Sequence, residues 1–163
     1  MKLFLLRHAD ALDGDDDALR PLSPSGQATV VKLALFLKGG ELLEPMPLWH
    51  SGLVRSEETA RLFKEQMGWK RSKLIPTEDM SPEDPPVALA ISLEHVSKDL
   101  LIVGHEPHLG RFTSLLLTGE EDALLIKIRK CALLCLERKD KEEGKRKSAR
   151  WKLRWLLDPK LLG

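Results

Sequence analysis

The stretch "DLLIVGHEPHLG", from Asp99 to Gly110, joins an uninterrupted apolar run to an abrupt polar turn. A short apolar run bounded by turn residues is typical of a strand that is buried on both faces of a parallel sheet. Residues 100–103 are therefore predicted to form such a strand, with His105 just beyond its carboxyl end. The polar residues that follow begin a predicted helix, which Gly119 ends.

Strand-like and helix-like segments alternate along most of the chain. Further strands are predicted at residues 2–6, 46–51 and 73–76, and further helices from Ser23 to Gly39, from Leu53 to Met67 and from Pro85 to Val96. The first of these helices has Ser23 as a good N-cap and Pro24 at its first position. Strands that alternate with helices in this order predict a three-layer α/β/α fold, with a mainly parallel central sheet and helices on both faces.

The C-terminal part of the chain has a different pattern. Strands are predicted at residues 123–128, 131–137 and 150–158, with "RKDKEEGKRK" (138–147) as a solvated hairpin turn. In the last strand, cationic residues alternate with Trp151, Leu153, Trp155 and Leu157. This alternation predicts one apolar face and one wet face, as in an antiparallel strand.

Length and composition indicate a single domain, residues 1–163, with a hydrophobic core of its own. Hydrophobic content of 42% and charged content of 31% are ordinary for a globular protein. The formal net charge of +1 gives no reason to expect nucleic acid as a partner. Cys131 and Cys135 lie four apart in an apolar run, which fits neither a CxxC pair nor a zinc motif, so buried free thiols are expected.

The start of the chain could be mistaken for a signal sequence. Its apolar stretch, Leu3 to Leu6, is shorter than the roughly 7–15 residues that such a sequence needs. No segment approaches the roughly 20 apolar residues of a transmembrane helix. We therefore expect a cytoplasmic protein without a membrane partner.

Two predicted strands end in a histidine, and a third leads to an arginine. The first strand is followed by Arg7 and His8, and the strand at 100–103 by His105, while Arg55 lies on the first turn of a predicted helix. Ligands bind beyond the carboxyl ends of the strands in open α/β sheets, so these four side chains are expected to converge. Two guanidiniums and two imidazoles predict a site for a multiply charged anion, because arginine forks match phosphate oxygens.

Each of these residues has an ordinary explanation when it is taken alone. An Arg-His pair at a strand end is often a surface pair, His105 could satisfy the start of a helix, and Arg55 could be a solvated helix residue. In "HEPH", His105 and His108 are three apart with Pro107 between them, which lacks the i,i+4 spacing of HExxH, so no metal site is predicted. The joint occurrence of the four residues is what favours a functional site.

Three motifs resemble those of the histidine phosphatase superfamily. They are "LLRHADA", "SGLVRSEETA" and "IVGHEP", which correspond in order to its RHG strand end, its S-x-x-x-R-x-x-x-T-A helix start and its late G-H motif. The segment "LRPLSPSGQ" and the final "WKLRWLLDP" are similar to the SixA-type phosphohistidine phosphatase branch. The resemblance runs from Met1 to about Pro159 and is more specific for the superfamily than for a substrate.

The resemblance implies a role for each of the four residues. His8 would be the nucleophile that takes the phosphoryl group on its ring nitrogen. Arg7 and Arg55 would bind phosphate oxygens, and His105 would donate a hydrogen bond to the same phosphoryl group. No metal or other cofactor is implied, since the protein itself supplies the cations.

Three further residues have weaker assignments. By the same resemblance, Arg20 would add a contact at the pocket mouth, although a salt bridge to the Asp13–Asp17 loop is an equal alternative. Ser51 is expected to shape the phosphate pocket through its backbone. Asp10 is expected to serve the loop or an arginine rather than the chemistry.

The sequence departs from the superfamily pattern in two places. Ala9 stands where the motif has glycine, which is tolerable if its backbone φ is negative. The segment "TEDMSPEDPP" also offers four candidate proton donors, Glu78, Asp79, Glu83 and Asp84, and no motif selects one of them. Asp79 is the preferred candidate, and the alternative is that all four are solvated loop acids.

The doubtful proton donor bears on the substrate. An alkoxide leaving group needs an acid, whereas the imidazole of a phosphohistidine needs less help. Only about thirty residues separate Trp69 from Leu100, so no large cap subdomain is expected and the pocket could admit a phosphorylated side chain of another protein. The leading hypothesis is a phosphatase of phosphohistidine on a protein such as a histidine-phosphotransfer domain. The alternatives are a phosphatase of small phosphate esters, a less favoured phosphoglycerate mutase, and a phosphate-binding module without turnover.

Overall fold

The central sheet has the strand order β3-β2-β4-β1-β5-β6 in a computed structural model that describes residues 1–139 and 151–163. Its strands are β1 (Lys2–Arg7), β2 (Leu48–His50), β3 (Leu74–Pro76), β4 (Leu100–Gly104), β5 (Leu133–Arg138) and β6 (Trp151–Leu157). The first four strands are mutually parallel, while β5 pairs antiparallel with β1, and β6 pairs antiparallel with β5. The predicted mainly parallel sheet with an antiparallel C-terminal strand is confirmed.

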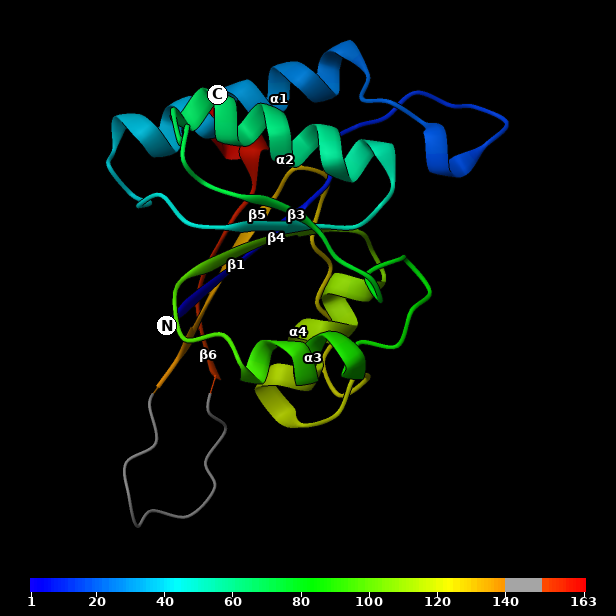
Figure 1. The fold of residues 1–163 in the computed structure, drawn as a ribbon, viewed down its shortest axis with the longest axis vertical. Helices are drawn as coiled ribbons and strands as arrows, with labels where there is room; N and C mark the ends of the chain where they lie inside the picture. Colours follow the sequence, from blue (N-terminus) through cyan, green and yellow to red (C-terminus); the bar gives the residue numbers. More distant parts are fainter. Residues whose placement is uncertain (140–150) are drawn as a thin grey trace.

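Helices cover both faces of this sheet, as Figure 1 shows. One face carries α1 (Pro24–Gly39) and α2 (Val54–Met67), and the other carries α3 (Val87–Glu94) and α4 (His108–Thr118). Short 3₁₀ turns, η1 (Asp17–Leu19) and η2 (Pro159–Leu162), follow β1 and β6. The predicted three-layer α/β/α architecture is therefore confirmed. None of the helices in the described residues is both long and apolar enough to cross a membrane.

Local sequence signals set the helix ends. The Ser23 hydroxyl accepts a hydrogen bond from the Gly26 amide at the start of α1, with Pro24 at the first helical position. Gly68 and Gly119 end α2 and α4 in the left-handed conformation, at φ values of 75° and 89°. Glycine adopts this conformation without the strain that a side chain would add, so these ends follow directly from the sequence.

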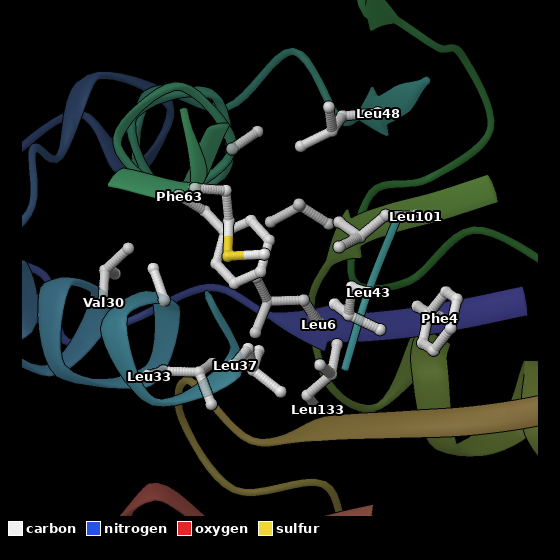
Figure 2. Packing of buried hydrophobic residues seen from close by; sticks show 14 of the residues in the cluster. Phe4, Leu6, Val30, Leu33, Leu37, Leu43, Leu48, Phe63, Leu101 and Leu133 are labelled. Atoms are coloured by element: carbon white, nitrogen blue, oxygen red, sulfur yellow. The ribbon is translucent and has the colours of Figure 1, made fainter. Parts of the chain in front are cut away.

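The core consists of two apolar clusters, one on each face of the sheet. Alternate side chains of β1 divide between them: Leu6 packs toward α1 and α2, and Leu5 toward α3 and α4. Figure 2 shows the first cluster, in which Phe63 of α2 and Leu33 of α1 meet the side chains of the strands. Burial on both faces explains why the parallel strands read as continuous apolar runs.

The prediction of a strand at residues 123–128 is wrong, because this segment has an irregular backbone. Leu125 is exposed, so the apolar run is not a buried face. The Ile128 amide donates to the Glu106 carboxylate at 2.6 Å, and the Ile128 carbonyl accepts from the Arg7 guanidinium at 3.0 Å. Side chains thus bind the backbone groups that a neighbouring strand would have used.

The strand β6 lacks the single apolar face that was predicted for it. A bulge between Cys135 and Leu136 of β5 leaves Arg154 outside the pairing, so that Leu153 and Trp155 pair with successive residues. Trp151 accordingly packs in the cluster beneath α3 and α4, while Trp155 lies against Phe4 in the other cluster, at 5.9 Å between ring centroids. An inserted residue shifts the side-chain alternation by one, which the sequence does not reveal.

Two smaller predictions have different outcomes. Cys131 and Cys135 are buried free thiols, as expected. The predicted hairpin turn at 138–147 lies almost entirely outside the described residues.

Candidate active site

The structure brings His8 and His105 together at the carboxyl edge of the sheet. His8 directly follows β1 and His105 directly follows β4; these strands are parallel neighbours, with Arg7 opposite Gly104. The two imidazole rings lie 4.9 Å apart between centroids, tilted by 49°. Arg55, on the first turn of α2, is only 4% exposed and acts electrostatically on both histidines. The convergence predicted from the strand ends is therefore present in the fold.

The imidazole of His8 has a defined orientation. Its Nδ1 donates to the carbonyl oxygen of Ala9 at 2.7 Å, since a carbonyl can only accept. The neutral ring therefore carries its proton on Nδ1, and Nε2 keeps the lone pair that a nucleophile needs. Ala9 is fully buried and its φ lies outside the left-handed region, so the methyl group that replaces the usual glycine fits without strain.

Burial keeps both histidines neutral. Desolvation lowers the pKa of His8 from its usual 6.5 to about 4, and the positive charges of Arg55, Arg7 and Lys130 add to this effect. Desolvation likewise lowers the pKa of His105 to about 3. At neutral pH, then, His8 is a neutral base surrounded by cations.

The two arginines are each held by their terminal nitrogens. Arg7 Nη1 donates to the Ile128 carbonyl at 3.0 Å. Arg55 Nη1 donates to the Asp17 carbonyl at 2.6 Å, and its Nη2 donates to the Asp17 carboxylate at 3.0 Å. The Nε atoms of both arginines are buried without a hydrogen-bond partner in the described part of the chain. Each guanidinium therefore keeps a donor free for an anion.

The hydroxyl of Ser51 contacts His105 directly, at 2.5 Å between Oγ and Nε2. The same hydroxyl oxygen accepts from the Leu53 amide at 3.5 Å, and in the described part of the chain Nε2 is the one acceptor within reach of the hydroxyl proton. The remaining ring nitrogen, His105 Nδ1, is buried and makes no hydrogen bond to any described residue. With Ser51 as the donor, Nδ1 carries the imidazole proton and is a third free donor beside Arg7 and Arg55.

Arg20 belongs to the loop rather than to the free pocket mouth. Its guanidinium pairs with Asp17 at 3.0 Å and with Asp13 at 3.4 Å, and its Nε donates to the Leu12 carbonyl at 2.8 Å. These contacts are the salt-bridge alternative that the sequence left open. Asp10 also has a structural role: its carboxylate forms a salt bridge with Lys130 at 2.6 Å and accepts a hydrogen bond from the Ser23 hydroxyl at 2.7 Å.

The structure places Asp79 beside His108 of α4, where its backbone and its carboxylate both act on that ring. Asp79 itself has a left-handed φ of 57°. The charged groups that act on His8 are instead cations. The role of Asp79 as proton donor stays a prediction.

Sequence reasoning missed two residues that support the arginines of the site, and it assigned no role to His108. Asp17 holds Arg55, and Glu106 binds the amides of Gly110 and Ile128 and so fixes the carbonyl that holds Arg7. His108 is fully buried beneath the loop that carries Asp79. The only available signals were the acidic run before Arg20 and the acid in "GHEP", neither of which is specific. The described residues contain no cluster of three or more His, Cys, Asp or Glu side chains that could hold a metal ion.

Comparison with known proteins gives a consistent picture of the fold. No protein-family model and no curated protein sequence matches this chain. The solved structure of the protein histidine phosphatase SixA complexed with tungstate is similar over the whole of both chains, with 23% identity and a TM-score of 0.80.

Two other solved structures are similar at lower identity. The α-ribazole phosphatase from Shigella flexneri has 15% identity and a TM-score of 0.72, with 98% of this chain and 97% of that chain covered. A phosphoserine phosphatase variant from Entamoeba histolytica, in complex with phosphoserine, has 16% identity and a TM-score of 0.63, with 97% of each chain covered. The chain therefore has the fold that these three phosphatases share.

Proposed function

We propose that this protein is a phosphatase of the histidine phosphatase superfamily, with residues 1–163 as one catalytic domain and His8 as the nucleophile. The observation that carries the proposal is a set of three buried nitrogens that have no hydrogen-bond partner among residues 1–139 and 151–163: Nε of Arg7, Nε of Arg55 and Nδ1 of His105. Buried donors are normally paired, so three of them next to a neutral histidine indicate a missing acceptor. A phosphoryl group has three oxygens to offer them.

The residues suit a two-step transfer. His8 Nε2 attacks phosphorus while the bond to the leaving group breaks, which gives a phosphohistidine on His8. Arg7, Arg55 and His105 donate to the phosphoryl oxygens and stabilise their charge during transfer. Water then attacks the phosphorus of phosphohistidine, the bond to Nε2 breaks, and orthophosphate leaves. Because protein cations neutralise the phosphoryl charge, the proposal includes no metal ion.

Phosphohistidine on a protein is the substrate class that we favour. Cations act on His8, and the preferred acid, Asp79, lies beside His108. An imidazole leaving group needs less protonation than an alkoxide. It takes its proton from solvent water as the bond to phosphorus breaks. Between β3 and α3 there is only a short loop, so a side chain on another protein, such as a histidine-phosphotransfer domain, can approach. By the same reasoning we expect protein dephosphorylation in cytoplasmic signalling.

A second candidate is a phosphatase of small phosphate esters. It is favoured by the structural similarity to the α-ribazole and phosphoserine phosphatases, whose names indicate ester substrates. In that case a carboxylic acid is required, and Asp79 is the first residue to replace. A phosphate-binding module without turnover is the third possibility, and the same experiment separates all three.

The test compares two substrates with one protein. A phosphohistidine-bearing protein and p-nitrophenyl phosphate are each incubated with the wild type and with His8→Ala. We expect fast loss of phosphohistidine, poor turnover of the ester and neither activity in His8→Ala. Efficient ester cleavage without action on phosphohistidine would favour the second candidate. Phosphate binding without any turnover would favour the module.

A further inference from the structure

Among the described residues, the charge of Arg55 is compensated by Asp17, in the loop between β1 and α1. Arg55 is almost completely buried, yet its Nη1 reaches the Asp17 carbonyl at 2.6 Å and its Nη2 reaches the Asp17 carboxylate at 3.0 Å. A buried guanidinium without a partner is costly, so this double contact stabilises Arg55 in one orientation. In Figure 1 this loop lies on the side of the molecule toward which β1 runs.

Asp17 is itself held by a second arginine. Arg20 Nη1 donates to the other carboxylate oxygen of Asp17 at 3.0 Å, and Arg20 Nε donates to the Leu12 carbonyl at 2.8 Å. The Asp16 carboxylate accepts from the Ala18 amide and caps the short turn η1 that begins at Asp17. The loop therefore presents Asp17 to Arg55 through contacts of its own.

The two contacts of Asp17 leave the Nε edge of the Arg55 guanidinium open to an oxyanion. Arg55 has donors on Nε, Nη1 and Nη2, so a bidentate contact can use either its two terminal nitrogens or Nε with one of them. Asp17 engages the two terminal nitrogens with one hydrogen bond each, while Nε stays buried and without a partner in the described residues. Arg7 is similar in part: its Nη1 donates to the Ile128 carbonyl, and its Nε has no partner in the part of the chain that the structure describes.

We propose that Asp17 is a positioning residue that holds Arg55 with its Nε toward the phosphoryl group, and that Arg20 in turn holds Asp17. This inference rests on the proposed function, since it assumes that the anion of this site is a phosphoryl group. The opposite possibility is that Asp17 competes with phosphate for Arg55. The two possibilities predict opposite changes in phosphate affinity when Asp17 is replaced. Removal of a positioning residue weakens phosphate binding, and removal of a competitor strengthens it.

The test measures the dissociation constant of inorganic phosphate by calorimetry, so that it does not depend on the identity of the substrate. Asp17→Ala is expected to weaken binding about tenfold, the effect of one hydrogen bond to a charged group. Arg20→Ala is expected to weaken it about threefold, because it acts one contact further away. Asp15→Ala is the matched control: it removes an exposed carboxylate of the same loop and should leave binding unchanged.

A double-mutant comparison tests whether Asp17 acts through Arg55. In an Arg55→Ala background, Asp17→Ala should cause no further loss, because the residue that it positions is gone. A tenfold loss in both backgrounds would overturn the inference, as would unchanged or tighter binding in Asp17→Ala alone. If Asp17→Ala fails to fold, Asp17→Asn decides, with an expected loss of about threefold since the carbonyl contact and one acceptor remain. A wild type that does not bind phosphate at all would instead contradict the proposed function and, with it, this inference.

Discussion

The two walls of the site are held in place in different ways. The strand wall, Arg7, His8 and His105, lies at the ends of adjacent parallel strands and is fixed by backbone hydrogen bonds, such as that from the His8 amide to the Gly104 carbonyl at 2.9 Å. The loop wall, Asp13, Asp17 and Arg20, is held by side chains, chiefly the salt bridges from Arg20 to the two aspartates.

This difference separates the residues proposed to contact the phosphoryl group from the residues that position Arg55. A sheet ladder survives the loss of any one side chain, so a change in the strand wall removes a reacting or stabilising group and little else. The loop wall depends on a few ionic contacts, so a single substitution there alters the position of Arg55 rather than removing it. Larger effects on turnover are therefore expected from the strand wall than from the loop wall.

Apart from loss of the nucleophile His8 itself, the largest effect is expected from Arg7→Ala in the strand wall. Its guanidinium donates to the developing charge, and loss of one such donor costs about 10²–10³ in kcat. Turnover of a phosphohistidine protein is the measurement, with Arg71→Ala, an exposed arginine beyond α2, as the control. A loss smaller than that of Asp17→Ala would reverse the ranking of the two walls.

An intermediate effect is expected from Ser51→Ala. The variant removes the hydroxyl proton that keeps the His105 proton on Nδ1, and one hydrogen bond of this kind corresponds to about a tenfold loss in kcat. Nitrogen NMR of His105 should show the proton on Nδ1 in the wild type and a mixture of tautomers in the variant. Ser97→Ala, an exposed serine before β4, should change neither quantity. A wild-type proton on Nε2 would contradict the assignment.

The smallest effect concerns stability in acid. Burial lowers the pKa of His8 to about 4 and that of His105 to about 3, so below pH 6.5 the unfolded chain binds protons that the folded protein does not. The free energy of unfolding should therefore fall as the pH drops from about 6.5 toward 4. The loop wall should persist over this range, since hydrogen bonds from Arg20 and Arg55 lower the pKa of Asp17.

Urea unfolding at a series of pH values measures this effect. His105→Ala should flatten the dependence on pH, and His95→Ala, which replaces an exposed histidine, should not. If the free energy of unfolding depends on pH equally in the wild type, His105→Ala and His95→Ala, the histidines of the strand wall are not the cause of the acid destabilisation.

The sequence predicted the layered fold and the strand wall because both depend on local signals. Apolar runs that end in polar residues place Arg7, His8 and His105 at strand ends, and the neighbouring parallel strands then bring them together. Arg55 was found in the same way, from its position on the first turn of α2.

A salt bridge from Arg20 to this loop was one of two alternatives at the sequence level, but the contact of Asp17 with Arg55 could not be predicted. Several aspartates lie between β1 and α1, and nothing in their spacing distinguishes Asp17 from its neighbours. The same holds for the bulge in β6, which depends on one residue left out of a pairing, and for residues 123–128, whose backbone is bound by Glu106 and Arg7. In each case a long-range contact overrides a local pattern.

The central claim is that phosphate passes through a covalent bond to His8. The most direct measurement is to mix the protein with a labelled phosphohistidine protein, stop the reaction within milliseconds and locate the acid-labile phosphoryl group by mass spectrometry. We predict an adduct on His8 in the wild type and none in His8→Ala. An adduct that survives in His8→Ala, or turnover in that variant at the wild-type rate, would contradict the claim.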